Sequence, residues 1–367
     1  VRRVTRMGLW LSVIYGLIFT IPFIWAEDIL LLIGQEPEVA AEAHKYLVIA
    51  AWQMVPALLV MTLKAFFVAL EKTSIILIAT IGMAVLNGFL NYALIFGNWG
   101  MPEMGIRGAA IASVTGATLT VVILFAYALS QLPQYQLLKN IWRSDTEIMS
   151  KVFRLGWPIG ITSLAEGGLF AASAIMMGWI SEISLAAHGV AIQLASLTFM
   201  VHLALSQAAT VRAGRALGRN DAVGLRRGGI VATAASAVFA ILTMLIFWAI
   251  PEQLISLFID PNEAERENLI RVGVGLLFMA GLFQVVDALQ VMALGLLRGV
   301  QDTAVPMVMA AISYWVIGMP ASYLLAFPMG YGGQGLWLGL VIGLAVAAIL
   351  LMWRFWMLVI QRITWKP

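Results

Sequence analysis

Ten long apolar runs are the feature that most constrains the fold of this 367-residue chain. Each run approaches or exceeds the roughly 20 residues that a helix needs to cross a bilayer. Backbone groups inside a bilayer must satisfy one another, so runs of this kind fold as helices. We therefore predict an all-α polytopic membrane protein. The spans are expected near residues 7–26, 46–69, 75–96, 106–130, 155–179, 184–208, 229–250, 269–293, 304–327 and 334–360.

The composition excludes several classes of function. Hydrophobic residues make up 62% of the chain and charged residues 11%, which excludes a soluble enzyme. Cysteine is absent, so disulfides and thiolate metal sites are excluded. The sequence also has no P-loop, HExxH or nucleophile-elbow motif. We therefore expect no enzymatic activity, no cofactor and no coupling to ATP.

The basic residues indicate an orientation in the membrane. With the N-terminus in the cytoplasm, seventeen of the 22 Lys and Arg residues fall on the cytoplasmic side, including Arg362 and Lys366 near the C-terminus. The opposite side holds only Lys45, Arg107, Arg266 and Arg271. Positive charge collects on the cytoplasmic side of membrane proteins. We predict that both termini are cytoplasmic and that the basic surplus contacts anionic lipid and not nucleic acid.

The chain also resembles itself at an offset of about 228 residues. AEDILLLIG from Ala26 aligns with PEQLISLFI from Pro251, and FFVALEKTS from Phe66 aligns with LLRGVQDTA from Leu296. Spans one to four thus match spans seven to ten, whereas spans five and six have no partner. The pattern predicts two parallel, pseudo-symmetric six-helix lobes, of which this chain holds four helices plus six. We expect the first two helices to be lacking; the alternative is a natural ten-helix protein.

These considerations give a domain organisation. We predict an N-lobe remnant of four helices at 1–131, a cytoplasmic linker at 132–153 and a six-helix C-lobe at 154–367. Ser144 and Glu147 have the spacing of a capping box that would open a helix leading into span five. Interfacial helices in the linker are expected to lay one apolar face on the membrane. That face consists of Leu137, Leu138, Ile141 and Trp142.

Two carboxyl groups lie within predicted spans, where a charge is costly and indicates a functional site. Glu166 lies twelve residues from Arg154, and Asp287 lies eleven from Arg298. At about 1.5 Å per residue, both are roughly 17–18 Å from the cytoplasmic edge, near the bilayer midplane. We predict that they share a cavity that binds protons or Na⁺, because two neighbouring carboxylates do not both ionise easily. The alternative is a pair of protonated acids that hydrogen-bond for packing.

Other polar residues within the spans are candidates for lining a cavity. Three glutamines in the C-lobe and three small polar residues in the N-lobe share this property. They are Gln193, Gln284, Gln290, Asn87, Asn91 and Ser113. The i,i+4 spacing of Asn87 and Asn91 puts them on one helix face. For each of these residues, hydrogen bonding between packed helices is the competing interpretation.

With these residues in view, the chain resembles the multidrug and toxic compound extrusion (MATE) family, and within it the NorM branch. The resemblance covers essentially the whole chain. It is carried by GWPIGITSLAEGGLF, AAHGVAIQLASLTFM, VRAGRALGRND, FQVVDALQVMALGLLRGVQDT and GQGLWLGLVIGL. The family fold has twelve helices in two lobes, so the resemblance implies that this chain starts at the third family helix.

The resemblance also implies site residues. Glu166 and Asp287 match the family's C-lobe cation site, whereas Asn87 and Asn91 match an N-lobe polar site that an acid on the absent first helix completes. Many relatives carry Asp at the position of Asn91, and Phe283 replaces an aromatic hydroxyl of some NorM proteins. Both departures leave open which cation is bound and which lobe couples ion binding to transport.

The expected function is a secondary active efflux antiporter. It would export cationic amphipathic compounds in exchange for Na⁺ or H⁺ by alternating access, as a monomer in the bacterial inner membrane. One alternative is a lipid-linked oligosaccharide flippase of the same superfamily, for which a strongly basic cavity would be expected. Another is a non-transporting membrane receptor, which the two-lobe repeat argues against.

Overall fold

The computed structural model describes residues 2–32, 34 and 36–360, so Arg362 and Lys366 lie outside the described residues. Within the described ranges every regular element is helical. The α-helices are α1 (Arg2–Ile24), α2 (Ala26–Leu32), α3 (Pro37–Ala50), α4 (Met54–Ala69), α5 (Ser74–Phe96), α6 (Ile106–Gln131), α7 (Thr146–Ile180), α8 (Glu182–Gly218), α9 (Ala222–Ala249), α10 (Pro251–Ser256), α11 (Arg266–Gly299), α12 (Ala304–Ala311), α13 (Met319–Ala326) and α14 (Gly332–Trp353). Short 3₁₀ turns are η1 (Ala51–Gln53), η2 (Asn98–Gly100) and η3 (Pro133–Tyr135), and π-helical segments are η4 (Ile312–Gly318) and η5 (Arg354–Val359).

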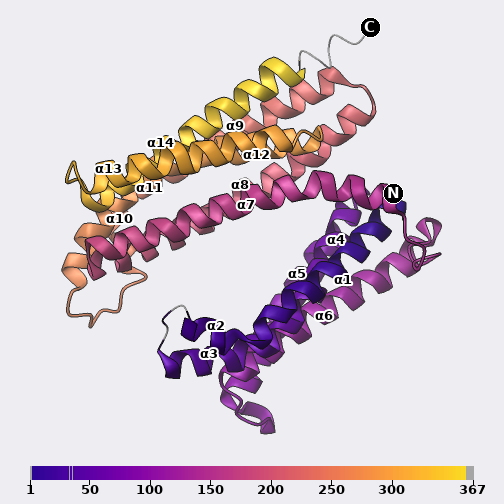
Figure 1. The fold of residues 1–367 in the computed structure, drawn as a ribbon, viewed down its shortest axis with the longest axis horizontal. Helices are drawn as coiled ribbons and strands as arrows, with labels where there is room; N and C mark the ends of the chain where they lie inside the picture. Colours follow the sequence, from indigo (N-terminus) through magenta and orange to yellow (C-terminus); the bar gives the residue numbers. More distant parts are fainter. Residues whose placement is uncertain (1, 33, 35, 361–367) are drawn as a thin grey trace. The chain divides into compact units, whose positions relative to one another are not determined.

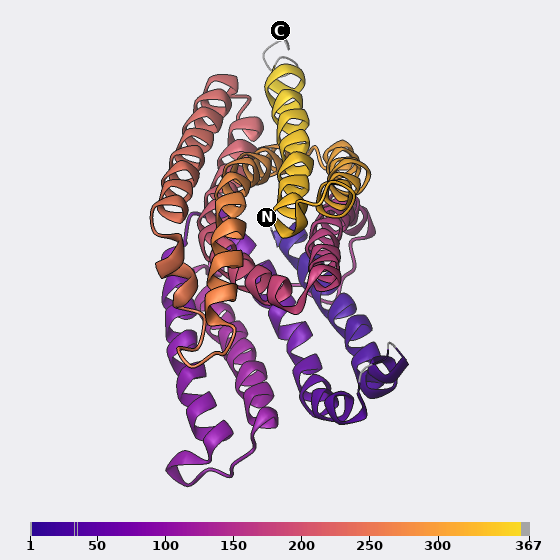
Figure 2. The same cartoon turned by 90° about the vertical axis from the view of Figure 1, so that its left-hand side faces the viewer.

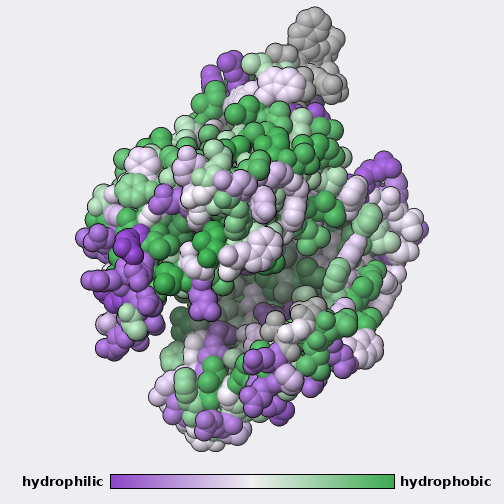
Figure 3. Space-filling model, turned by 60° about the vertical axis from the view of Figure 1, so that its left-hand side comes forward, coloured by the Kyte–Doolittle hydropathy of each residue, from purple (hydrophilic) through white to green (hydrophobic). Residues whose placement is uncertain are grey.

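The helices confirm the predicted membrane architecture. Ten of the described helical segments are long and apolar enough to cross a bilayer, and each overlaps one predicted span. Apolar side chains cover much of the helix flanks on the face drawn in Figure 3, and hydrophilic side chains gather in separate clusters. Exposed apolar flanks are expected where lipid is the solvent.

The chain divides into two compact units, residues 1–153 and 154–367. In the first unit, α1 packs on α4, and α6 packs on α3, α4 and α5 (Figure 1). A small core joins α1, α4 and α6 to the segment that follows α6. Its largest members include Phe66, Phe67, Leu124 and Leu137.

The second unit is built around α11, which packs on α8, α9 and α14 (Figure 2). Its continuous core contains most of the chain's fully buried apolar side chains. Helix α7 begins in the first unit and continues in the second, and its helical pattern runs without interruption past Pro158.

The internal repeat of the sequence corresponds to the same pairing of helices inside each unit. In the first unit α1 packs on α4 and α5 packs on α6. In the second, the matching helices α9 and α11 pack together, as do α13 and α14. The sequence offset therefore corresponds to repeated helix pairs.

A glycine ladder explains how α14 packs so closely. A Cβ added to Gly339 would lie 2.2 Å from the backbone nitrogen of Ser322, and one added to Gly343 would lie 2.7 Å from the Cα of Gly318. Only glycine permits such an approach of backbones. These glycines therefore let α14 pack backbone to backbone against the helix before it.

The segment between α6 and α7 differs from the sequence prediction. It contains the single turn η3 and further turns, and not an interfacial helix, and Leu137 is buried in the first unit's core. The N-cap is also one residue later than predicted, because the Ile148 amide donates to Asp145 Oδ1 at 3.2 Å and α7 begins at Thr146. The Asp145 carboxylate accepts from the amide three residues on, the role that Ser144 was expected to play.

Candidate functional site in the C-terminal unit

The site begins on one face of α7. Ser163, Glu166 and Phe170 follow one another at spacings of three and four residues, which place them on a common helix face. All three line a cavity. Glu166 is half-buried. The helix thus presents a carboxyl group between a hydroxyl and an aromatic ring.

A second carboxyl group comes from α11. Asp287 is 2% exposed and lines the same cavity, as does Phe283 one turn earlier. The Oδ1 atom of Asp287 is buried and has no hydrogen-bond partner among the described residues. A buried acceptor without a donor is costly unless a proton, cation or water satisfies it.

The two carboxyl groups therefore belong to one cavity of about 390 Å³, which lies between α7, α8, α11 and α14. Its lining consists of Ser163, Glu166, Gly167, Phe170, Ile192, Ala195, Ser196, Phe199, Met200, Phe283, Asp287 and Trp337. Its volume is within the range of roughly 300–1,000 Å³ typical of small-molecule sites. A mostly apolar wall with two acids suits a cation that also carries apolar surface.

An aromatic wall that the sequence did not reveal completes the cavity. The Phe283 ring packs edge-on against Phe170 at 5.9 Å and against Trp337 at 5.5 Å between ring centres. Trp337 Nε1 donates to His188 Nδ1 at 3.1 Å. Since indole only donates, Nδ1 accepts and the His188 proton resides on Nε2, which faces Ser173 Oγ at 3.4 Å. His188 thereby fixes the orientation of the Trp337 ring.

The three predicted glutamines lie elsewhere. Gln284 Nε2 donates to the Ala195 carbonyl at 3.1 Å, and Gln290 Nε2 donates to Tyr314 Oη at 2.5 Å. Both are buried, and neither is among the residues that line the cavity. Gln193 lies exposed on α8, also outside the lining. In this structure the cavity holds the two acids of the predicted set but none of its amides.

The two asparagines of the N-terminal unit are joined to each other, and the Oδ1 atom of Asn91 is buried without a hydrogen-bond partner among the described residues. Asn91 Nδ2 donates to Asn87 Oδ1 at 3.0 Å within α5. The Asn87 amide packs near Gly116 of α6, on the side of the helix that also carries the half-buried Ser113. The cavities found in this unit are lined by other residues.

A metal site with three or more His, Cys, Asp or Glu ligands is not found among residues 2–32, 34 and 36–360. The acids and hydroxyls around the cavity do offer oxygen donors, the ligand type that hard cations prefer. Two carboxyl groups, Ser163 and Ser196 make up this donor set.

Comparison with known proteins decides the family. A family model described as MatE matches residues 1–93 and 158–324, which is more than half of the chain. The chain belongs to the MATE family. This assignment confirms the resemblance drawn from the residues around Glu166 and Asp287.

Relatives support the assignment across the length of the chain. "Probable multidrug resistance protein NorM" of Rhizobium meliloti (strain 1021) is 44% identical over 370 residues, covering 100% of this chain and 79% of the relative. The protein of the same name from Agrobacterium fabrum (strain C58 / ATCC 33970) is 44% identical over 360 residues, covering 98% and 77%.

Solved structures show the same fold. "Crystal structure of MATE in complex with MaL6" matches with a TM-score of 0.89 at 18% identity, covering 100% of this chain and 80% of the other. "Crystal structure of eukaryotic MATE transporter AtDTX14" matches with a TM-score of 0.86 at 22% identity, covering 99% and 80%. The chain is thus a multi-pass helical protein with the fold of MATE transporters.

Proposed function

We propose that this MATE protein is a secondary active antiporter that exports cationic amphipathic compounds in exchange for Na⁺ or H⁺. The observation that carries the proposal is the single cavity that contains Glu166 and Asp287 within an aromatic wall. The names of the NorM relatives support multidrug substrates. The expected setting is the bacterial inner membrane, with both termini cytoplasmic and the protein monomeric.

Exchange follows from competition for two carboxyl groups. When they are ionised, their charge favours an organic cation whose apolar surface rests on Phe170, Phe283 and Trp337. When protons or Na⁺ neutralise them, that attraction is lost and the compound leaves. Each ligand therefore lowers the affinity for the other, and this negative coupling is reciprocal. Alternating access then needs only that the two ligands favour different states of the transporter.

The same cavity argues against the other candidates. A flippase for a lipid-linked pyrophosphate would need positive charge, whereas Glu166 and Asp287 make this cavity acidic. A receptor would bind the cation without any need for competing ions. Exchange is therefore the property to test.

The experiment uses the purified full chain in proteoliposomes, with ethidium as the probe. An inward gradient of Na⁺ or of protons should drive ethidium movement, and the effective gradient identifies the ion. Glu166→Gln and Asp287→Asn remove one ionisable group each at nearly constant shape. Each should slow exchange at least about tenfold, as expected for loss of an interaction with a charged group.

Two variants serve as matched controls. Glu182→Gln removes an exposed carboxylate of α8 outside the cavity, and Asn91→Leu removes the polar pair of α5. The first should exchange normally, and the second should lose less than either cavity variant. Ion-driven exchange that survives in both Glu166→Gln and Asp287→Asn would contradict the proposal.

A further inference from the structure

The N-terminal unit contains a second polar cavity, which the proposed transport does not use. It has a volume of about 430 Å³ and lies where α1, the linker and the start of α7 meet. We call it the arginine pocket. Its lining consists of Arg2, Arg3, Arg6, Asn140, Arg143, Ser144, Asp145, Thr146 and Glu147.

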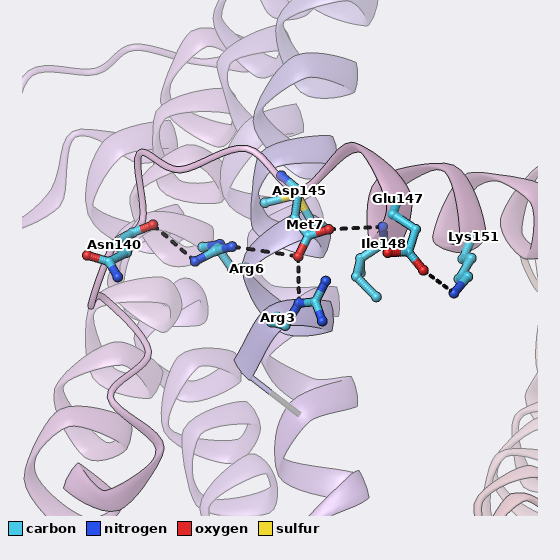
Figure 4. Close-up of polar contacts among 8 residues, drawn as sticks. All are labelled: Arg3, Arg6, Met7, Asn140, Asp145, Glu147, Ile148 and Lys151. Carbon is cyan, nitrogen blue, oxygen red and sulfur yellow. Dashed lines mark hydrogen bonds and ion pairs between the residues drawn. The ribbon is translucent and has the colours of Figure 1, made fainter.

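The charges of this pocket do not cancel. Asp145 accepts from Arg3 Nε at 2.6 Å and lies 4.0 Å from Arg6 Nη2, so one carboxylate serves two arginines (Figure 4). Glu147 is engaged by Lys151 at 2.6 Å. The lining therefore contains four guanidinium groups and two carboxylates. One of these carboxylates, Glu147, is already paired with Lys151, which does not line the pocket. The pocket keeps a positive surplus suited to an anion.

Arg6 has a hydrogen-bond donor in this pocket that lacks an acceptor. The residue is 6% exposed, and its Nη1 donates to the Asn140 carbonyl at 3.1 Å (Figure 4). Its Nε is buried and has no hydrogen-bond partner among the described residues. A guanidinium removed from water is stable only when its donors are paired. An anionic oxygen would supply the missing acceptor.

An apolar groove adjoins the arginine pocket. It has a volume of about 420 Å³ and is lined by Leu9, Trp10, Val13, Leu59, Phe125, Ile141 and Trp142. Both cavities share one face of α1, because Leu9, Trp10 and Val13 follow Arg6 at three, four and seven residues. They also share the linker, which Trp10 Nε1 holds by donating to the Ile141 carbonyl at 2.7 Å.

From this pairing we infer that the N-terminal unit binds an anionic phospholipid. The phosphate lies in the arginine pocket, and an acyl chain lies in the apolar groove. Along α1 the two cavities are offset by about 10 Å, the rise of seven residues, as headgroup and acyl chain are. Basic pockets between membrane helices recognise anionic lipid headgroups, and Trp142, which is 87% exposed, is typical of the membrane interface. A free phosphate would leave the groove unused.

The test measures which lipids the full chain retains. The protein is extracted from bilayers that contain equal amounts of phosphatidylglycerol and phosphatidylcholine, and native mass spectrometry reports the ratio of the two lipids bound. Phosphatidylglycerol should be enriched. Arg143→Gln should reduce this enrichment about fivefold, the effect of one basic residue near an anionic surface. Arg6→Gln should reduce the enrichment further. If the buried Arg6→Gln variant fails to fold, Arg143→Gln still tests the inference, because Arg143 is exposed and its substitution should not disturb the fold.

The control is Arg226→Gln, which removes an exposed arginine of α9 that lines neither cavity. It should leave the ratio unchanged. Trp142→Ala should lower retention of phosphatidylglycerol and leave retention of glycerol 3-phosphate unaltered. Two results would overturn the inference: equal retention of both lipids by the unaltered chain, or glycerol 3-phosphate bound as well as phosphatidylglycerol with no effect of Trp142→Ala. The second result would identify a site for free phosphate instead.

Discussion

The two units differ in how closely their helices pack. In the most apolar 18-residue stretch of α5, 6% of the residues are buried, whereas 56% are buried in that of the span from Gly332 to Met357. The glycines of these two helices differ in the same way: those along α14 let neighbouring backbones touch, while Gly82 and Gly88 of α5 meet nothing within 4 Å. Glycine in a membrane helix is therefore informative only when a partner backbone approaches it.

The same contrast holds for polar groups. Asn91 donates to Asn87, and its own Oδ1 is buried without a partner among the described residues, but an amide carries no charge in either case. Asp287 also has a buried oxygen without a partner in the described part of the chain, but it is a carboxyl group, which can ionise, and it lies in the more densely packed unit. Under the proposed function, the dense packing around Asp287 would hold its carboxyl group in place for a cation.

Substituting a glycine of α14 tests whether this close packing stabilises the protein. Gly339→Ala places a methyl group 2.2 Å from the Ser322 backbone nitrogen, and backbone cannot move aside cheaply. We expect the free energy of unfolding to fall by about 1–3 kcal/mol, as in other overpacked cores. The measurement is unfolding of the purified protein in mixed micelles titrated with a denaturing detergent.

Gly82→Ala is the matched control for that measurement. Its added methyl group meets nothing within 4 Å, and alanine favours the helix by up to about 1 kcal/mol. It should be neutral or slightly stabilising. Equal destabilisation by both substitutions would show that the contrast in packing does not govern stability.

The sequence predicted the ten spans and the two acids for clear physical reasons. Apolar length specifies a membrane helix, and equal distance from flanking arginines placed Glu166 and Asp287 at one depth. Depth does not specify which way a side chain points. Gln284 and Gln290 lie three residues either side of Asp287, about 60° around the helix, so they contact α8 and η4 and not the cavity.

Other features depended on contacts that no local pattern records. Trp337 lies in an apolar stretch, and only the tertiary fold brings it beside Phe283 and His188. The arginine pocket likewise joins Arg6 to Asn140 and Asp145, which are far apart in the chain. The basic residues themselves were visible in the sequence, but they appeared only as a charge bias.

The aromatic wall offers a second way to sharpen the comparison. Trp337→Leu removes the indole from the cavity, whereas Trp179→Leu removes one that is 65% exposed on α7. Loss of a cation–π contact costs about 0.5–2 kcal/mol, so ethidium should bind roughly 2- to 30-fold more weakly to the first variant. Fluorescence titration of the purified protein measures the dissociation constants. A similar loss in both variants would remove Trp337 from the binding site.

The smallest effect is expected from the ion pair at the start of α7. Asp145 lies outside the membrane spans, and the hydrogen bond from Arg3 holds the pKa of its carboxyl group below the ordinary 3.8. Because the pKa is lowered in the folded state, the pair stabilises the protein fully above about pH 4 and loses its effect as the pH falls through the lowered value. The Arg3 partner is exposed to solvent, so the effect is small and screened by salt. Thermal unfolding of the unaltered chain and of Asp145→Asn should therefore differ slightly at pH 6, and the difference should shrink below pH 3.8. A difference that persists at low pH would contradict this role for the charge of Asp145, because Asn caps the Ile148 amide nearly as well and a protonated Asp carries no charge.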